Sequence, residues 1–383
     1  MPRDELRQPL RRRSMAERLW AKRPSRLRLA CLLAGAAYLG AGAWVISIPH
    51  ELAGEPVVLV AVPPVEDIKT ATIEPAAAEP AGETGAPAAA ERIAEPEPTA
   101  YPEEATVIVS SRRPLKPAPI AAVAETTTDG PLPRVSGNGK KPFDVYAQIT
   151  PMGIANSNRP KIAIVLGGMG LNASLTKKAI SELPGDITFG FAPYGENLQE
   201  QVNRARAQGH EILLQLPMEP LGYPANNPGP NTLLADDPEP GNLKSLHWHM
   251  SRFAGYAGIT NYMGGRFLAA PSALRPVLAE IKNRGLVFLE DAAIATSSVE
   301  ELSKVTGLRT RHSDVAIDAN PDAASIEEAL TQLERLAKTN GYAVGTGSGL
   351  EVTIDTLAEW AKELEGRGIV LVPVSAVYKG RIS

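Results

Sequence analysis

Residues 161–170 read KIAIVLGGMG, a short apolar run that ends in glycines. The five consecutive apolar residues at 162–166 have the length and composition of a strand buried on both faces, as in a parallel sheet. A helix is predicted directly after it, over 171–183, because apolar residues recur there at helical spacing and Asn172 or Ser174 can cap its first turn. A strand, a glycine turn and a helix form the opening of a βαβ unit.

The same alternation continues along the chain. Further strands are predicted at 187–191, 211–216, 258–261, 286–289, 315–318, 342–345 and 369–374, and further helices at 198–208, 242–253, 272–284, 299–305, 325–339 and 353–365. Strict alternation of this kind implies a parallel sheet, either closed as a barrel or open and doubly wound. About seven units in this length favour an α/β fold of the closed or nearly closed (β/α) barrel type, in a domain at 158–383.

The first part of the chain has a different composition. Residues 1–28 are rich in arginine, and an uncharged apolar run follows at 29–49. A run of about twenty apolar residues can cross a bilayer as a helix, and flanking basic residues stay on the cytoplasmic side. The sequence therefore predicts a basic cytoplasmic segment, one transmembrane helix in the inner membrane, and a periplasmic remainder. A cleaved signal peptide is the alternative.

Residues 50–157 are rich in proline, alanine and glutamate. Such a segment buries too little apolar area to offset its chain entropy, so we expect a disordered linker. Residues 107–110 (VIVS) form an apolar island within it, either a docking segment or a transiently extended piece. The linker is long enough to carry the folded domain away from the membrane toward the cell wall.

Charge and cysteine content exclude several functions. A net charge of −4 gives no overall attraction to nucleic acid, and we expect no such partner. The single cysteine, Cys31, lies in the apolar run and excludes a disulfide framework and a cysteine-based zinc site. The glycines at 167–170 follow a strand, as in nucleotide-binding turns, but the full G-x-G-x-x-G spacing and the lysine-serine pair of a P-loop are missing.

The five histidines do not suggest a metal or a catalytic pair. His247 and His249 are two positions apart on one predicted helix, so their side chains diverge. His50 lies at the predicted membrane edge, His210 precedes a strand, and His312 lies in a polar loop. We interpret them as surface or packing residues.

Polar residues gather where the predicted strands end, which is where barrels of this type carry their chemistry. The residues of interest are Tyr194, Glu219, Tyr223, Asn261, Arg266, Glu290, Asp291 and Asp318. In one interpretation the carboxylates pair with Arg266 and with backbone donors, and hold the loops in place. In the other they line a glycan-binding groove, in which Asn261 forms hydrogen bonds and the tyrosines, Tyr262 included, stack on sugar rings.

Two of these carboxylates, Glu290 and Asp318, are the candidates for catalysis if the domain is a hydrolase. Paired carboxylates without a metal also suggest glycoside hydrolysis. That assignment depends on the distance between the carboxylates, which the sequence does not give.

The strand ends also carry a resemblance to a known family. IAIVLGGMG, GHEILLQLPMEP, GITNYMGGRF, VFLED, GYAVGTG and IVLVPVSAV occur in this order over residues 161–377. Together they resemble the divergent polysaccharide deacetylases, an exported bacterial branch of the metal-dependent carbohydrate deacetylases. The segment at 216–220 (LPMEP) is the most specific match.

The resemblance implies a divalent metal such as zinc, held by an aspartate after the first strand and by histidines after the fourth and seventh strands. Such an ion lowers the pKa of bound water and polarises the amide carbonyl under attack. In this chain the corresponding positions are Gly167 and Gly168, Tyr262, and Ser348. Glycine has no side chain, and serine and tyrosine ligate metals poorly at neutral pH. We therefore expect no metal cofactor.

These observations predict a membrane-anchored periplasmic domain in cell-envelope carbohydrate metabolism that has lost the family's metal site. Its expected partner is an envelope glycan or an envelope protein. The alternative is an active hydrolase that deacetylates an N-acetylated amino-sugar polymer. A scaffold without a ligand is a third possibility.

Overall fold

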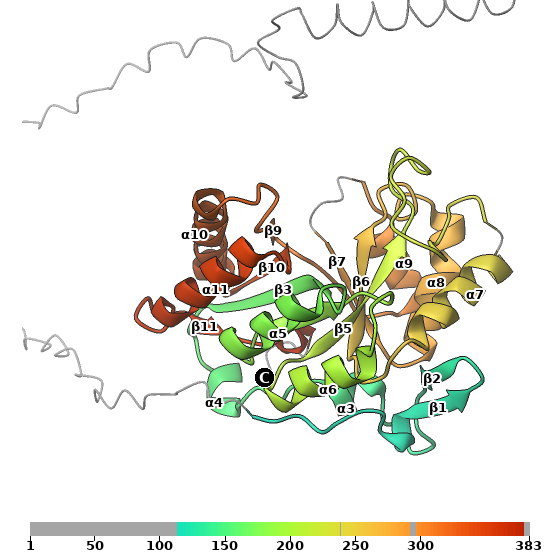
Figure 1. Ribbon diagram of the computed structural model, residues 1–383, viewed down its shortest axis with the longest axis horizontal. Helices are drawn as coiled ribbons and strands as arrows, with labels where there is room; N and C mark the ends of the chain where they lie inside the picture. Colours follow the sequence, from blue (N-terminus) through green and yellow to red (C-terminus); the bar gives the residue numbers. More distant parts are fainter. Residues whose placement is uncertain (1–112, 238, 292–295, 379–383) are drawn as a thin grey trace, which may run out of the picture. The chain divides into compact units, whose positions relative to one another are not determined.

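The computed structural model describes residues 113–237, 239–291 and 296–378 (Figure 1). Within these residues the centre of the fold is a sheet in which every paired strand is parallel. Its strands are β3 (Lys161–Met169), β4 (Thr188–Phe191), β5 (Ile212–Met218), β6 (Gly258–Met263), β7 (Val287–Glu290), β8 (Thr310–His312), β9 (Val315–Ala316), β10 (Tyr342–Ser348) and β11 (Val370–Leu371). The strand order is β8-β7-β6-β5-β4-β3-β10-β9, and β11 pairs with β3.

Helices connect these strands in the predicted alternation. They are α5 (Ala173–Glu182), α6 (Leu198–Ala207), α7 (Glu239–Met250), α8 (Pro271–Asn283), α9 (Val299–Thr306), α10 (Ala323–Asn340), α11 (Glu351–Glu363) and the short α12 (Ser375–Tyr378). Asn172 caps α5, because its side chain accepts hydrogen bonds from the N–H groups of Ser174 and Leu175. The predicted parallel α/β fold is confirmed.

One short segment joins the two ends of the sheet. β8 pairs with β7 at one end and β9 pairs with β10 at the other, and only Ser313 and Asp314 separate β8 from β9. The Ser313 N–H donates to the Glu290 carbonyl at 2.9 Å, and the Asp314 N–H donates to the Val344 carbonyl at 2.7 Å. The sheet therefore has the curvature of a barrel. The strand predicted at 315–318 is present as the two-residue β9, and the polar β8 before it was not predicted.

Side chains alternate between the two faces of the sheet, as expected for strands. Along β3, Ile162, Ile164 and Leu166 pack in one apolar cluster with the surrounding helices. Ala163 and Val165 belong to a second cluster, with apolar residues of the other strands and with the chain's last described residues. The barrel interior is thus filled by apolar side chains and plugged from the end where the strands begin, which we call the base.

The prediction of a disordered linker at 50–157 is wrong for residues 113–157. These residues contain a 3-10 turn (Ala121–Val123), the hairpin β1 (Ala124–Thr127) and β2 (Gly130–Pro133), and the helices α3 (Pro142–Tyr146) and α4 (Met152–Ala155). Phe143 and Tyr146 are buried against the base. Composition failed as a guide because this segment buries its apolar side chains against the barrel instead of forming a core of its own.

A buried arginine fastens this segment to the base. The Arg206 side chain is 1% exposed, and its Nε donates to the Lys116 carbonyl at 2.9 Å. Its Nη1 donates to the carbonyls of Tyr146 (3.1 Å) and Gly255 (2.9 Å). Burial lowers the pKa of Arg206 to about 10, so the side chain is still charged at neutral pH. One guanidinium therefore joins residues far apart in the sequence.

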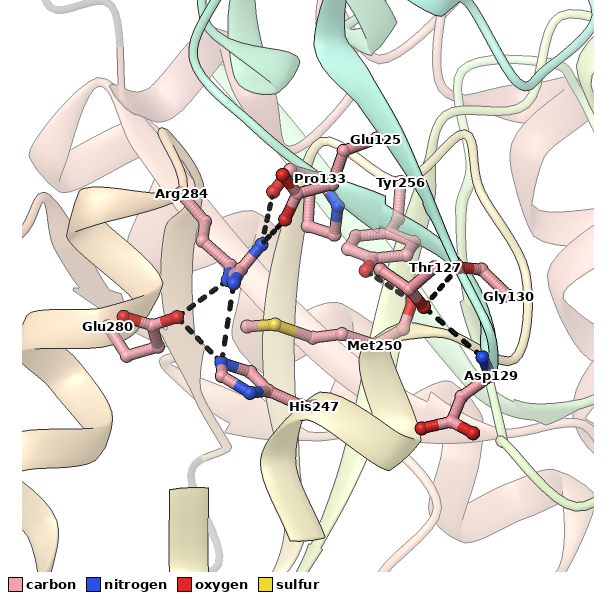
Figure 2. Close-up of polar contacts among 10 residues, drawn as sticks. All are labelled: Glu125, Thr127, Asp129, Gly130, Pro133, His247, Met250, Tyr256, Glu280 and Arg284. Carbon is pink, nitrogen blue, oxygen red and sulfur yellow. Dashed lines mark hydrogen bonds and ion pairs between the residues drawn. The ribbon is translucent and has the colours of Figure 1, made fainter. Parts of the chain in front are cut away.

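The hairpin is attached by a second polar cluster, which Figure 2 shows. Arg284 Nη1 donates to the Glu125 carboxylate at 2.9 Å and to the Pro133 carbonyl at 2.8 Å. Arg284 Nε donates to Glu280 at 2.6 Å, and His247 Nε2 lies 2.7 Å from the same carboxylate. His247 thus has the structural role that the sequence suggested.

Replacing Arg284 by glutamine should loosen the hairpin, because three acceptors lose a charged donor. We expect a loss of stability of about 2 kcal/mol and faster proteolysis within residues 124–133. Arg275→Gln is the control, since Arg275 is an exposed arginine on α8. Equal cleavage of the two variants would contradict this role for Arg284.

Several predictions lie outside the described residues: the basic segment at 1–28, the transmembrane helix at 29–49, His50 and the island at 107–110. Among the residues that the structure does describe, no helix has both the length and the apolar character needed to span a membrane.

Candidate functional site

The carboxyl ends of the parallel strands meet at one end of the barrel, which we call the mouth. Ser348 of β10 is the register partner of Gly167 of β3, and the Gly349 N–H donates to the Gly167 carbonyl at 2.8 Å. Two of the three positions singled out by the family resemblance are therefore neighbours. Tyr262 lies near the end of β6, with β4 and β5 between it and β3, and its side chain is 41% exposed.

Gln215 is a mouth residue whose position at a strand end the sequence indicates, but whose role it does not. Its side-chain oxygen accepts the Gly168 N–H at 2.9 Å. A Cβ atom added at Gly167 would lie only 2.5 Å from Gln215 Nε2. Gln215 thus occupies the space that a side chain at position 167 would enter. The signal was present in the sequence, because glutamine interrupts the apolar run of β5.

Asp291 is the centre of a hydrogen-bond chain at the mouth. Thr346 Oγ1 donates to Asp291 Oδ1 at 2.6 Å, and Ser313 Oγ lies 3.3 Å from Thr346 Oγ1. The Asp291 N–H donates to the Asn261 side-chain oxygen at 2.9 Å, and Asn261 Nδ2 donates to the Met263 carbonyl at 2.7 Å. The buried Asn261 thus holds the ends of β6 and β7 together.

The two candidate catalytic carboxylates lie in different environments. Asp318 Oδ2 accepts the Ser348 N–H at 2.7 Å and the Thr353 hydroxyl at 3.0 Å, which places it beside the mouth. Glu290, the last residue of β7, lines a hollow with Ser297 and His312, whereas Asp291 after it accepts a hydrogen bond from Thr346. The structure therefore does not bring Glu290 and Asp318 together as a pair facing one cleft.

Burial raises the pKa of both carboxyl groups above its ordinary value. Hydrogen bonds from Ser297 to Glu290, and from Ser348 and Thr353 to Asp318, oppose that shift. The charge of Asp291 raises both pKa values further. Asp291 is the residue that links these carboxylates electrostatically.

Glu219 and Arg266 form the ion pair that one interpretation of the sequence anticipated. The Glu219 side chain is buried and also accepts the Ala235 N–H, at 2.6 Å, while Arg266 continues to Asp236. The N–H groups of Arg266 and Phe267 donate to the Glu219 carbonyl, both at 3.1 Å. This pair holds the loops that follow β5 and β6.

The tyrosines predicted to stack on sugars differ in accessibility. Tyr194 donates its hydroxyl to the Pro230 carbonyl at 2.7 Å, and burial raises its pKa. Its ring packs closely under Gly229, where an added Cβ would lie 2.5 Å away. Tyr223 is half-buried, whereas Tyr262 is exposed at the mouth.

The other histidines differ in burial and in their contacts. His210 is buried before β5 and stacks on Phe189 with 3.9 Å between ring centroids. His249 is buried with Nε2 2.8 Å from the Asn231 carbonyl, and His312 is exposed. Within the described part of the chain, histidine, cysteine, aspartate and glutamate form no group of three suited to a metal ion.

A parallel barrel with these strand ends agrees with the resemblance found in the sequence. The chain belongs to the divergent polysaccharide deacetylase family, whose sequence profile matches residues 164–378.

Three proteins illustrate the similarity. The uncharacterized protein YibQ of Escherichia coli (strain K12) is 23% identical over 218 residues, which cover 57% of this chain and 67% of that protein. The crystal structure of uncharacterized protein ATU2773 from Agrobacterium tumefaciens C58 is 44% identical, with a TM-score of 0.63, and the match covers 65% of this chain and 99% of that one. The catalytic domain of a peptidoglycan N-acetylglucosamine deacetylase from Eubacterium rectale is 12% identical, with a TM-score of 0.38, over 59% of this chain and 90% of that one.

Proposed function

We propose that this protein binds a cell-envelope glycan at the barrel mouth and does not hydrolyse it with a metal. The observation that carries the proposal is the set of side chains at the mouth. Gly167 and Gly168 offer no ligand atom from a side chain, Gln215 fills the space above Gly167, and Ser348 is their neighbour.

The residues at the mouth do not fit the zinc-type ion that the family implies. Such an ion is held by carboxylate and imidazole ligands, and a neutral amide or an alcohol replaces them poorly. The two nearby carboxylates, Asp291 and Asp318, already accept hydrogen bonds from Thr346, and from Ser348 and Thr353. An aspartate at position 167 would also collide with Gln215 unless that side chain moved.

The same residues suit a neutral, hydroxyl-rich ligand. Amides, hydroxyls and carboxylates supply the donors and acceptors that sugar hydroxyls need. The exposed ring of Tyr262 supplies an amphipathic face at the edge of the mouth. Glycan binding therefore uses side chains at the mouth that do not serve as ligands for a catalytic metal.

We place this activity in the periplasm, on a protein anchored in the inner membrane. The support for this location is the arginine-rich segment at 1–28 and the apolar run at 29–49. Protease added to intact spheroplasts should digest the barrel domain. Full protection of that domain would contradict this location.

The binding test uses the full-length protein and insoluble peptidoglycan. We expect the protein to sediment with the glycan, and Tyr262→Ala to weaken its retention about tenfold, the loss of one aromatic contact of about 1.4 kcal/mol. Tyr342→Ala is the matched control, because Tyr342 is equally exposed (43%) but starts β10 at the base. Absence of sedimentation, or equal losses in the two variants, would overturn the proposal.

Metal content and acetate release separate this function from the alternative hydrolase. After dialysis the full-length protein should retain far less than one zinc per chain, and it should release no acetate from an N-acetylated amino-sugar polymer. Stoichiometric zinc together with acetate release would establish the deacetylase instead.

A further inference from the structure

An open groove lies at the base of the barrel, opposite the mouth. It has a volume of about 380 Å³, and apolar side chains from three parts of the chain line it. Ile149 and Ile154 come from the segment before β3, Leu364 follows α11, and Ile369 and Leu371 belong to the region of β11. We call it the base groove.

The base groove has unusual apolar exposure around it. Ile149 is 73% exposed, and Met152, in the same short helix as the groove residue Ile154, is 69% exposed. Large apolar side chains that are open to water beside a groove mark a surface that is covered by another segment or molecule. The backbone and the neighbouring chain indicate which segment covers the base groove.

The backbone of β11 also points into this groove. The N–H groups of Val370 and Val372 donate to Pro160 and Ile162, at 2.9 Å each. Successive residues of a strand direct their peptide groups to opposite edges. Leu371, between these two, therefore directs its N–H and carbonyl away from β3 and toward the groove that it lines. An extended segment could pair with β11 there.

The chain itself enters the described structure at this groove. Arg113 is the first described residue, and it is one of the groove's lining residues. The backbone of Arg113 lies beside Gly209, and the Leu115 N–H donates to the Arg206 carbonyl at 2.8 Å. The apolar island VIVS, residues 107–110, ends three positions before Arg113.

We propose that residues 107–110 dock into the base groove as an extended segment along β11. Val107, Ile108 and Val109 would cover the exposed apolar side chains, and Leu371 would gain backbone partners. The docked segment fastens the linker to the end of the barrel opposite the mouth and leaves the mouth open to ligand.

The short connection favours this occupant over a second copy of the chain. A segment tethered by a few residues has an effective concentration on the order of 1 mM at its groove. A second copy present at about 1 µM would need about 1000-fold tighter binding to compete. Even weak contacts therefore suffice for the chain's own segment.

Disulfide formation tests the docking in the full-length protein. Cys31→Ser removes the native thiol, and Ile108→Cys is combined with Ile149→Cys in the groove. With oxidised glutathione added as the oxidant, we expect an intramolecular disulfide, identified by mass spectrometry of the linked peptides. It should form about tenfold faster than in the control pair Ile108→Cys with Leu171→Cys, because docking raises the local thiol concentration. Leu171 is 59% exposed and follows β3 at the mouth end.

Hydrogen exchange provides a second readout that needs no cysteine. The Leu371 amide should exchange faster in the double variant Ile108→Asp, Val109→Asp than in the unaltered protein. Equal disulfide rates for the two cysteine pairs would overturn the proposal, as would unchanged exchange at Leu371. Disulfides formed between two chains at Ile149→Cys would assign the groove to a second copy and would also overturn it.

Discussion

Replacing Arg206 by methionine should lower the free energy of unfolding by about 4 kcal/mol. Methionine matches much of the volume of arginine, but it leaves the carbonyls of Lys116, Tyr146 and Gly255 without their donor. Because Arg206 is almost fully buried, water cannot replace that donor without opening the base. Chemical unfolding followed by circular dichroism measures the loss.

Arg204→Met is the matched control, two positions earlier on the same helix. Arg204 is exposed and pairs only with Glu200 on the surface, so its loss should change stability by well under about 1 kcal/mol. Arg206→Lys should recover little of the stability, because one ammonium group cannot reach three acceptors in the geometry of the guanidinium fork. Equal stabilities for the Arg204 and Arg206 methionine variants would show that the segment at 113–147 is held by other contacts.

The fold was predictable because its signals are local. The apolar run in β3 and the capping residue Asn172 each identify their element without knowledge of the rest of the chain. β8 was missed because Arg311 and His312 look like loop residues, and they form a strand only through pairing with β7. Local composition cannot report a strand that a neighbouring strand stabilises.

The site was predictable only in part, for the same reason. The neighbouring positions of Gly167 and Ser348 follow from the order of parallel strands. The role of Gln215 does not follow from the order of the strands, because it depends on a contact between residues that are 47 positions apart. Glu290 and Asp291 both follow the strand predicted from the sequence, but Glu290 ends β7 and lines a hollow with Ser297 and His312, whereas Asp291 bonds to Thr346.

Residues 113–157 show why composition alone misplaced the domain boundary. The prolines and polar residues at 113–157 indicate disorder only if the segment must form its own core. Phe143 and Tyr146 bury themselves against the barrel instead. A domain boundary drawn from composition therefore fell too late in the chain.

Lowering the pH from 7 to 4 should cost the folded protein about 3 kcal/mol through His249 alone. Burial lowers the pKa of His249 to about 4, against an ordinary value of 6.5. The Asn231 carbonyl opposes that shift, and the charge of Arg252 adds to it. The unfolded chain therefore binds a proton more readily than the folded one. The contribution of neutral His249 to stability is fully present above about pH 6.5, and it is lost as the pH falls to about 4.

His249→Gln isolates this contribution, because glutamine does not titrate. The difference in unfolding free energy between the two proteins should change by about 3 kcal/mol between pH 7 and pH 4, whatever the absolute stability of the variant. Glu290 and Asp318, whose pKa values are raised by burial, act with the opposite sign, since the folded state takes up their protons more readily. Both groups are common to the two proteins, so their effects cancel in the difference.

If His249→Gln kept the pH dependence of the unaltered protein, the histidine would have to accept its proton inside the fold at little cost. Its surroundings argue against this, because Nε2 already contacts the Asn231 carbonyl and the rings of Tyr194 and Trp248 pack beside the imidazole.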